Sequence, residues 1–338
     1  MNKAFEGKEI LVTGGAGFIG SEVARTLFRE CKDITVRIFD DFSYGSLFNL
    51  RDLLESKHER LHITKGDLTD KASVRRAVKN ANVIIHLAAH AFIPECYDHP
   101  ENFVNSNIIG TFNLLTSILN SKIEGFVHVS TCEVYGTAEY LPIDENHPTR
   151  PGSTYAASKL AAENLVLTLH KERDIPAVIL RPFNTYGPRD SHPRVIPEII
   201  SQLFRGNILR LGNISPTRDF SFVSDIARGI IKAATTNEGV GDIINLGSGK
   251  GTCIKELIDL IADIMKVDRY RVVVDKKRLR PCDVERSFAN TAKAGRLLNW
   301  KPITSLRKGL EKTIEWYQKN GAKWRWEMED YEIPYIRQ

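Results

Sequence analysis

A glycine-rich turn near the N-terminus constrains the fold more than any other segment. Gly14, Gly17 and Gly20 follow the apolar run 9–13 and open the amphipathic run 19–30. Glycines permit a tight turn and let the backbone approach a pyrophosphate, while the N-terminus of the next helix supplies N–H donors and a positive dipole. This strand–turn–helix context predicts a nucleotide-binding loop rather than a purely structural turn.

Strand-like and helix-like runs alternate over the first half of the chain. Beyond the first two, the patterns predict strands at 35–39, 83–86, 126–130 and 177–182, and helices at 70–79, 108–119 and 158–170. Alternation of this kind is typical of parallel strands joined by crossover helices. Near-continuous apolar strands fit a sheet that is covered on both faces.

After residue 182 the pattern changes. Residues 183–220 are rich in Pro, Gly and Arg, and the later runs predict helices at 222–235, 254–265 and 306–320 and strands at 242–246 and 270–274. The predicted fold is therefore α/β, a Rossmann-type doubly wound parallel sheet with a smaller C-terminal substrate-binding lobe. We expect residues 1–182 with about 221–250 to form the dinucleotide-binding domain, and residues 183–220 with 251–338 to form the smaller lobe.

Composition excludes several classes of protein. The chain has 338 residues and a net charge of +5, a bias too weak to indicate a nucleic-acid partner. No apolar run reaches the roughly 18 residues of a membrane-spanning helix, and the N-terminus lacks the apolar core of a secretory signal. The five cysteines show no CxxC spacing, so we expect neither disulfides nor a metal site. We also expect a cytoplasmic location.

Two acidic residues follow early strands of the predicted sheet. Asp40 ends the strand after the glycine turn, about 20 residues on, where a carboxylate holds the adenosine ribose and repels a 2′-phosphate. The predicted cofactor is therefore NAD rather than NADP. Asp67 follows the third strand, and it either approaches the adenine edge or caps the next helix, a role for which Thr69 and Asp70 compete.

A Tyr-x-x-x-Lys pair and a polar triplet predict the chemistry. Tyr155 and Lys159 lie one helical turn apart and so face one ligand, and a nearby ammonium is expected to lower the pKa of the phenol. Thr131, Cys132 and Glu133 follow a buried strand, at the sheet edge where ligands bind in such folds. Glu133 is either a general base or a surface carboxylate, and Cys132 either a weak acid or a small buried side chain.

Six short motifs occur in order along the chain: GGAGFIG (14–20), HLAA (86–89), NIIGTFNLL (107–115), VSTCEVYG (129–136), YAASK (155–159) and RPFNTYGPR (181–189). Together they resemble the extended short-chain dehydrogenase/reductase superfamily, and within it the nucleotide-sugar epimerases and dehydratases. The similarity continues through 217–230, 244–249 and 280–300. It covers nearly the whole chain.

The resemblance implies a retained NAD that oxidises a sugar C4 hydroxyl and later returns the hydride. It makes Tyr155 the base for the C4 hydroxyl proton, Lys159 the residue that holds the nicotinamide ribose, and Thr131 a hydrogen-bond partner of that hydroxyl. The implied cofactor site comprises Gly14, Gly17, Phe18, Ile19, Gly20, Asp40, Asp41, Ser43, Asp67, Leu68, Leu87, Ala88, Ala89, Tyr155, Lys159 and Pro182. The implied nucleotide-sugar site comprises His90, Asn184, Val195, Arg218 and Arg280, and a homodimer is expected.

Glu133 favours one branch of the superfamily. It resembles the glutamate of 4,6-dehydratases, which would remove the C5 proton while the C6 hydroxyl leaves as water and the hydride returns to C6. Cys132 stands where related enzymes carry Asp or Ser, and a thiol is a poor proton donor at neutral pH, so Glu133 would serve as both base and acid. We therefore predict a 4-keto-6-deoxy product. The substrate implied is a GlcNAc-type hexose, because residues 131–148 and 181–200 resemble bacterial dehydratases that act on nucleotide-activated N-acetylglucosamine or related hexoses.

Other functions stay open on the sequence alone. A 5,6-dehydratase, a UDP-glucuronate decarboxylase and a sugar 4-epimerase could each use the same residues. A catalytically silent NAD-binding sensor of the same fold is a remote alternative, because fold alone does not imply function.

Overall fold

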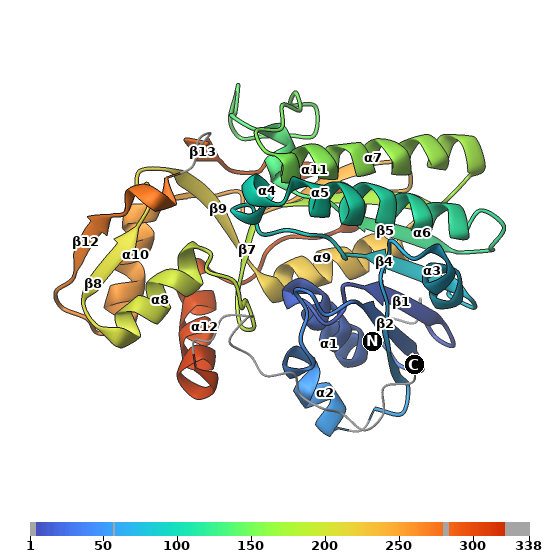
Figure 1. The fold of residues 1–338 in the computed structure, drawn as a ribbon, viewed down its shortest axis with the longest axis horizontal. Helices are drawn as coiled ribbons and strands as arrows, with labels where there is room; N and C mark the ends of the chain where they lie inside the picture. Colours follow the sequence, from blue (N-terminus) through green and yellow to red (C-terminus); the bar gives the residue numbers. More distant parts are fainter. Residues whose placement is uncertain (1–4, 57, 280–283, 322–338) are drawn as a thin grey trace.

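The computed structural model describes residues 5–56, 58–279 and 284–321, and its centre is a seven-stranded parallel sheet (Figure 1). The strands lie in the order β10-β6-β5-β4-β1-β2-β3, and every neighbouring pair is parallel. The order reverses between β1 and β4, which is where doubly wound sheets open a crevice for ligands. The strands are β1 (Glu9–Thr13), β2 (Thr35–Asp40), β3 (Leu61–Lys65), β4 (Val83–His86), β5 (Gly125–Val129), β6 (Ala177–Pro182) and β10 (Ile243–Leu246).

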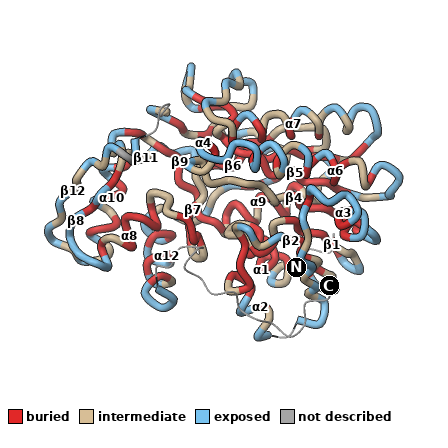
Figure 2. The backbone as a smooth tube through the Cα atoms, in the orientation of Figure 1, coloured by how far each residue is buried: buried red, intermediate tan, exposed pale blue. Residues whose placement is uncertain are grey.

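Helices cover both faces of this sheet, and every residue of its central strands β4, β5 and β6 is buried (Figure 2). One face packs against α1 (Phe18–Glu30), α9 (Val223–Thr235) and α11 (Ala292–Leu298). The other packs against α3 (Lys71–Val78), α6 (Thr111–Ser117) and α7 (Thr154–Arg173). The predicted Rossmann-type sheet is confirmed. Short segments complete this part: η1 (Leu47–Leu50), α2 (Arg51–Glu55), α4 (Glu95–Asp98), α5 (Pro100–Phe103), η2 (Val104–Gly110) and η3 (Cys132–Tyr135).

The smaller lobe has its own hydrophobic core, made by helices and short strands. Its helices are α8 (Val195–Arg205), α10 (Ile254–Ile264) and α12 (Leu306–Asn320), with the short η4 (Lys276–Arg278). β9 (Thr217–Phe222) pairs with β7 (Asn184–Tyr186), β11 (Gly251–Cys253) and β13 (Arg286–Ser287), while β8 (Ile208–Leu211) pairs with β12 (Arg271–Val274).

Three details differ from the sequence patterns. The Pro- and Gly-rich stretch 183–220 holds a helix and three strands that no pattern predicted. The single helix expected at 108–119 is a π-helical turn, η2, followed by α6. The helix α11 lies in the part of the chain assigned to the smaller lobe, yet its Ala294 and Leu298, with Trp300 after it, pack into the core of the large sheet.

Candidate active site

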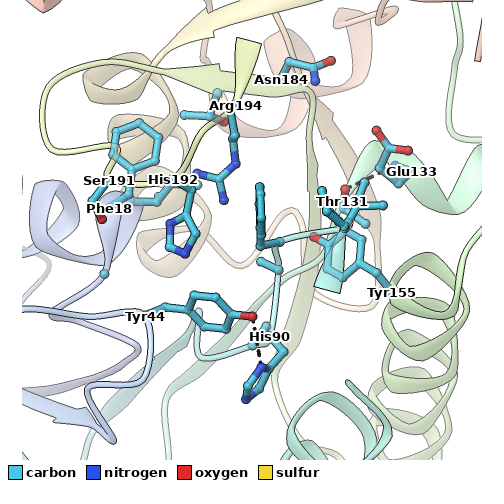
Figure 3. A pocket seen from close by; sticks show the side chains of 18 of the residues that line it. Phe18, Tyr44, His90, Thr131, Glu133, Tyr155, Asn184, Ser191, His192 and Arg194 are labelled. Carbon is cyan, nitrogen blue, oxygen red and sulfur yellow. Dashed lines mark hydrogen bonds between the residues drawn. The ribbon is translucent and has the colours of Figure 1, made fainter. Parts of the chain in front are cut away.

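One cavity of about 1110 Å³ lies at the carboxyl ends of β1, β2, β4, β5 and β6, and both lobes contribute to its wall. Every predicted site residue that the structure describes lines it, from Gly14 on the large sheet to Arg218 on β9. Arg280 lies outside the described residues. Figure 3 shows the side chains that face one another across this cavity.

The glycine turn forms a close-packed cradle at one end of the cavity. Gly14 has φ +69°, and a Cβ there would lie 2.7 Å from the Ala88 backbone nitrogen. A Cβ on Gly20 would lie 2.1 Å from the Gly14 carbonyl oxygen. The residue before α1 is Gly17, which has no side chain to cap the first N–H groups of the helix. A pyrophosphate fits these free donors, so the residues present suit a dinucleotide such as NAD.

Asp40 braces this cradle from the end of β2. Its carboxylate accepts from the Ala16 nitrogen at 2.8 Å and from the Phe42 nitrogen at 2.9 Å, and it is 5% exposed. Asp70 caps α3 by accepting from Ala72, whereas Asp67 accepts from Thr69 and lines the cavity. The cap is therefore Asp70, and the approach of Asp67 to the adenine stays a prediction.

A directed chain of hydrogen bonds holds the loop after β4. The Ala88 nitrogen donates to the Thr13 hydroxyl, which lies 2.7 Å from Nδ1 of His86. Nε2 of His86 lies 2.9 Å from the Thr111 hydroxyl, and Thr111 donates its hydrogen to the Asn107 carbonyl. This pattern assigns the proton of the imidazole to Nε2. Burial lowers the pKa of His86 to about 3, so the ring is neutral.

The catalytic side chains predicted from the sequence converge at the end of β5 (Figure 3). Thr131 caps η3 by accepting from the Glu133 nitrogen at 3.2 Å, which aims this turn at the cavity. Burial raises the pKa of Tyr155 to about 12, while its hydrogen bond with Thr131 and the charge of Arg194 lower it. The expected net lowering of the pKa of the phenol is therefore wrong for the protein alone. Burial also raises the pKa of the Cys132 thiol, which makes it a poor acid.

Lys159 lines the same cavity, and its side chain reaches back to β5. Its Nζ donates to the Val129 carbonyl at 2.8 Å, and the side chain is 2% exposed. Burial lowers the pKa of this amine to about 8, and the charge of Glu163 opposes that effect. The ammonium is thus held at the sheet edge, where the resemblance places the nicotinamide ribose.

The part of the cavity predicted to bind the nucleotide sugar holds an unsatisfied polar atom. The Oδ1 of Asn184 is buried and has no hydrogen-bond partner among the described residues. Arg218, on β9, and Val195, at the start of α8, line the same wall. A buried amide oxygen without a partner is costly, and a hydroxyl of a bound ligand would satisfy it.

Three residues that the sequence reasoning missed stand over the middle of the cavity. The Tyr44 hydroxyl donates to Glu95 and lies 3.2 Å from Nδ1 of His90, and its ring packs 4.9 Å from that of His192. Arg194 forms an ion pair with the buried Asp190 and points into the cavity (Figure 3). The signal was the cluster of His and Arg just before α8, directly beyond the motif that ends at 189.

Known proteins similar to this chain include enzymes of the predicted kind. The family model described as GDP-mannose 4,6 dehydratase matches residues 11–313. A dTDP-glucose 4,6-dehydratase of Streptomyces griseus is 34% identical over 322 residues, covering 93% of this chain and 95% of that protein. A dTDP-D-glucose 4,6-dehydratase of Mus musculus is 32% identical and covers 94% of this chain and 91% of that protein.

Solved structures extend the similarity to both branches of the superfamily. A dTDP-glucose 4,6-dehydratase from Streptomyces venezuelae, with NAD bound, has a TM-score of 0.85 at 30% identity, covering 94% of this chain and 98% of that one. A UDP-N-acetylglucosamine 4-epimerase from Methanobrevibacter ruminantium M1 has a TM-score of 0.84 at 30% identity, covering 94% and 100%. The NAD bound in the Streptomyces venezuelae structure, whose protein matches this chain over nearly its full length, confirms the prediction of NAD as cofactor.

Three findings lead to one assignment. A family model spans most of the chain, the relatives match over nearly their full length, and the predicted residues line one cavity. The chain belongs to the GDP-mannose 4,6-dehydratase family of NAD-dependent nucleotide-sugar enzymes, within the extended short-chain dehydrogenase/reductase superfamily.

Proposed function

We propose that the protein converts a nucleotide-activated hexose, of the GlcNAc type, into its 4-keto-6-deoxy derivative. The observation that carries this proposal is the convergence of Thr131, Glu133 and Tyr155 on one end of a cavity whose other end is the glycine cradle (Figure 3). A carboxylate beside a Tyr-Lys pair supplies a second base, which elimination needs and simple oxidation at C4 does not.

Each side chain has one proton to move or hold. Tyr155 takes the proton of the C4 hydroxyl, and Thr131 hydrogen-bonds the same oxygen. Bound NAD supplies the hydride acceptor at C4 and the donor at C6. Glu133 takes the C5 proton, which the new 4-keto group acidifies, and delivers a proton to the C6 hydroxyl as the C–O bond breaks and water leaves. A proton returned to C5 completes the product.

The substrate end suits a sugar nucleotide. We assign the diphosphate to Arg218, since guanidinium groups match phosphate oxygens, and a sugar or ribose hydroxyl to the unsatisfied Asn184 oxygen. Support for an N-acetylated hexose comes from the resemblance of residues 131–148 and 181–200 to dehydratases of such sugars, and from a similar structure named as a UDP-N-acetylglucosamine 4-epimerase.

One experiment separates the remaining reactions. The purified protein is incubated in deuterated water with UDP-GlcNAc, GDP-GlcNAc, UDP-glucose, dTDP-glucose, GDP-mannose or UDP-glucuronate, and the product is read by NMR. A new C6 methyl signal with deuterium at C5 is the expected result. An exocyclic vinyl signal would mean 5,6-elimination, loss of carbon dioxide a decarboxylase, a bare change at C4 an epimerase, and silence with bound substrate a sensor.

We also propose a homodimer in the cytoplasm. The surface of η2 and α6 exposes Val104, Ile109 and Phe112 to at least 41%, and this face adjoins α7. Exposed apolar side chains gathered on neighbouring helices favour association with a second copy. The cysteines that the structure describes are free, which suits a reducing compartment. Among the described residues no helix is long and apolar enough to span a membrane.

A further inference from the structure

A buried ion pair lies behind the catalytic side chains and takes no part in the proton transfers of the proposed reaction. Arg181, in β6, donates from Nε and Nη2 to the two carboxylate oxygens of Glu163 at 3.0 and 2.5 Å. Both side chains are at most 3% exposed. Burying such a pair is costly, because the loss of solvation offsets much of the attraction between the charges. A buried pair at this cost is expected to have a role beyond stability.

Glu163 shares one face of α7 with the catalytic pair. Tyr155, Lys159 and Glu163 follow one another at four-residue spacing, which places them on successive turns of the helix. Burial lowers the pKa of Lys159, and the charge of Glu163 acts against that effect. Burial and, to a smaller extent, the charge of Lys159 lower the pKa of His86, in β4, and of His128, in β5, so neither ring carries charge near neutral pH.

Arg181 links the same carboxylate to the turn that carries Glu133. The guanidinium carbon lies 4.6 Å from the centre of the Tyr135 ring, and Tyr135 is the last residue of η3. The Tyr135 hydroxyl donates to Oδ1 of Asn245, in β10, at 2.7 Å. One buried network thus contacts α7, β6, η3 and β10, the elements that place both proposed proton-transfer groups.

We propose that Glu163 is a positioning residue for the dehydratase reaction: held by Arg181, whose guanidinium packs on Tyr135, it keeps the Lys159 ammonium in place on the next turn of α7 and fixes α7 against the turn of Glu133. The link to Glu133 rests on the proposed function. The electrostatic link to Lys159 is a property of the folded chain and can be tested without turnover.

Competitive acetylation of the NAD-free protein reads the charge of Lys159 directly, because acetic anhydride reacts only with the neutral amine. The extent of reaction at Lys159 is followed by mass spectrometry over a pH series. We expect the titration midpoint of Lys159 to fall by about one pH unit in Glu163→Gln, the size expected for one charge a helical turn away. Glu172→Gln is the matched control, since Glu172 is exposed on the same helix. It should leave the midpoint unchanged.

A second variant covers the case in which Glu163→Gln fails to fold. The double change Glu163→Met and Arg181→Met removes both charges together, which buried pairs tolerate better than the loss of one partner. The midpoint should fall here too, since Lys159 loses the nearer charge. An unchanged midpoint in a folded variant, with thermal unfolding like that of the parent, would overturn the proposal.

Kinetics then separate this inference from the proposed function. With a substrate found by the NMR experiment, Glu163→Gln should lower kcat roughly tenfold with KM unchanged, and the loss of activity at high pH should begin at lower pH. A parent protein that makes no 4-keto-6-deoxy product would refute the proposed function while the acetylation result still decides the link from Glu163 to Lys159.

Discussion

Tyr155 has a phenol whose surroundings oppose its ionisation. Burial raises its pKa to about 12, and the hydrogen bond with Thr131 and the charge of Arg194 only partly offset this. One N–H of the Lys159 ammonium donates a hydrogen bond to the Val129 carbonyl. In the proposed reaction, the positive charge of the oxidised cofactor would lower the pKa of this phenol, so proton removal at C4 should be coupled to a loaded site.

Replacing the phenol tests this assignment. Tyr155→Phe should lower the rate of C4 oxidation by roughly 10²- to 10⁴-fold, the range for loss of a general base, while NAD stays bound. The rate is followed by NADH absorbance in a single turnover, and bound NAD by its content after gel filtration. Full activity in this variant would remove Tyr155 as the base.

Glu133 should act after the first hydride transfer. Glu133→Gln keeps the shape of the side chain and should leave C4 oxidation intact, so that NADH absorbance rises and then persists without water loss. Product is followed by the C6 methyl signal. Unchanged methyl formation would refute the role of Glu133 in elimination.

The buried amine of Lys159 gives a stability prediction with a definite sign. Its folded pKa, about 8, is lower than its ordinary value of 10.5, so the unfolded chain binds more protons between these values and stability rises with pH across that window. Lys159→Met should therefore raise the free energy of unfolding at pH 7 by about 1–3 kcal/mol, less the bond to Val129. The gain should shrink as the pH rises from 8 to 10.5. Urea unfolding at pH 7 and 10 measures it, and equal effects at both pH values would contradict burial of the charged amine as the cause.

At the level of helices and strands, the regular part of the fold was predictable and the irregular part was not. The strands β1, β4 and β6 and the helix α12 have the predicted bounds, because apolar runs and caps mark them in the sequence. The π-helical turn η2 and the helix α8 were missed. Their form depends on packing against other elements, as with Gly110, where a Cβ would lie 2.8 Å from the Leu68 side chain.

The candidate site shows the same division. The glycine turn, the polar triplet and the Tyr-Lys pair can each be recognised from the residue spacing within one short stretch of sequence. All three line the cavity. His192 and Arg194 have a local signal in the cluster just before α8, but their meeting with Tyr44 depends on the packing of the two lobes, which no single stretch of sequence predicts. The network of Glu163 is likewise assembled from four separate elements.

The glycine cradle makes a prediction at this scale. Gly20→Ala should lower the free energy of unfolding by about 2–4 kcal/mol, because its Cβ would lie 2.1 Å from the Gly14 carbonyl and backbone cannot move aside easily. Gly206→Ala, whose Cβ would meet nothing within 4 Å, is the control and should be neutral or slightly stabilising. Chemical unfolding of both measures the difference. Equal stability of the two variants would argue against close packing of the cradle.

For the whole molecule, the proposed homodimer can be tested at the exposed apolar face of η2 and α6. Ile109→Asp places a charge on that face and should convert a dimer into monomers, which sedimentation velocity would show directly. Ile303→Asp is the matched control, because Ile303 is 69% exposed at a distant part of the surface. A parent protein that sediments as a monomer, or a dimer that survives Ile109→Asp, would exclude this face.

The chain passes between the two lobes several times, and this has a practical consequence. After β6 it builds β7, α8 and β9 of the smaller lobe, returns to the large sheet for α9 and β10, leaves again for β11 and α10, and comes back for α11 before α12. No single cut by a protease would release either lobe as an intact piece. Likewise, the substrate specificity of a relative could not be transferred by exchanging one contiguous segment of the chain. A chimaera would need a matched junction at each point where the chain passes from one lobe to the other.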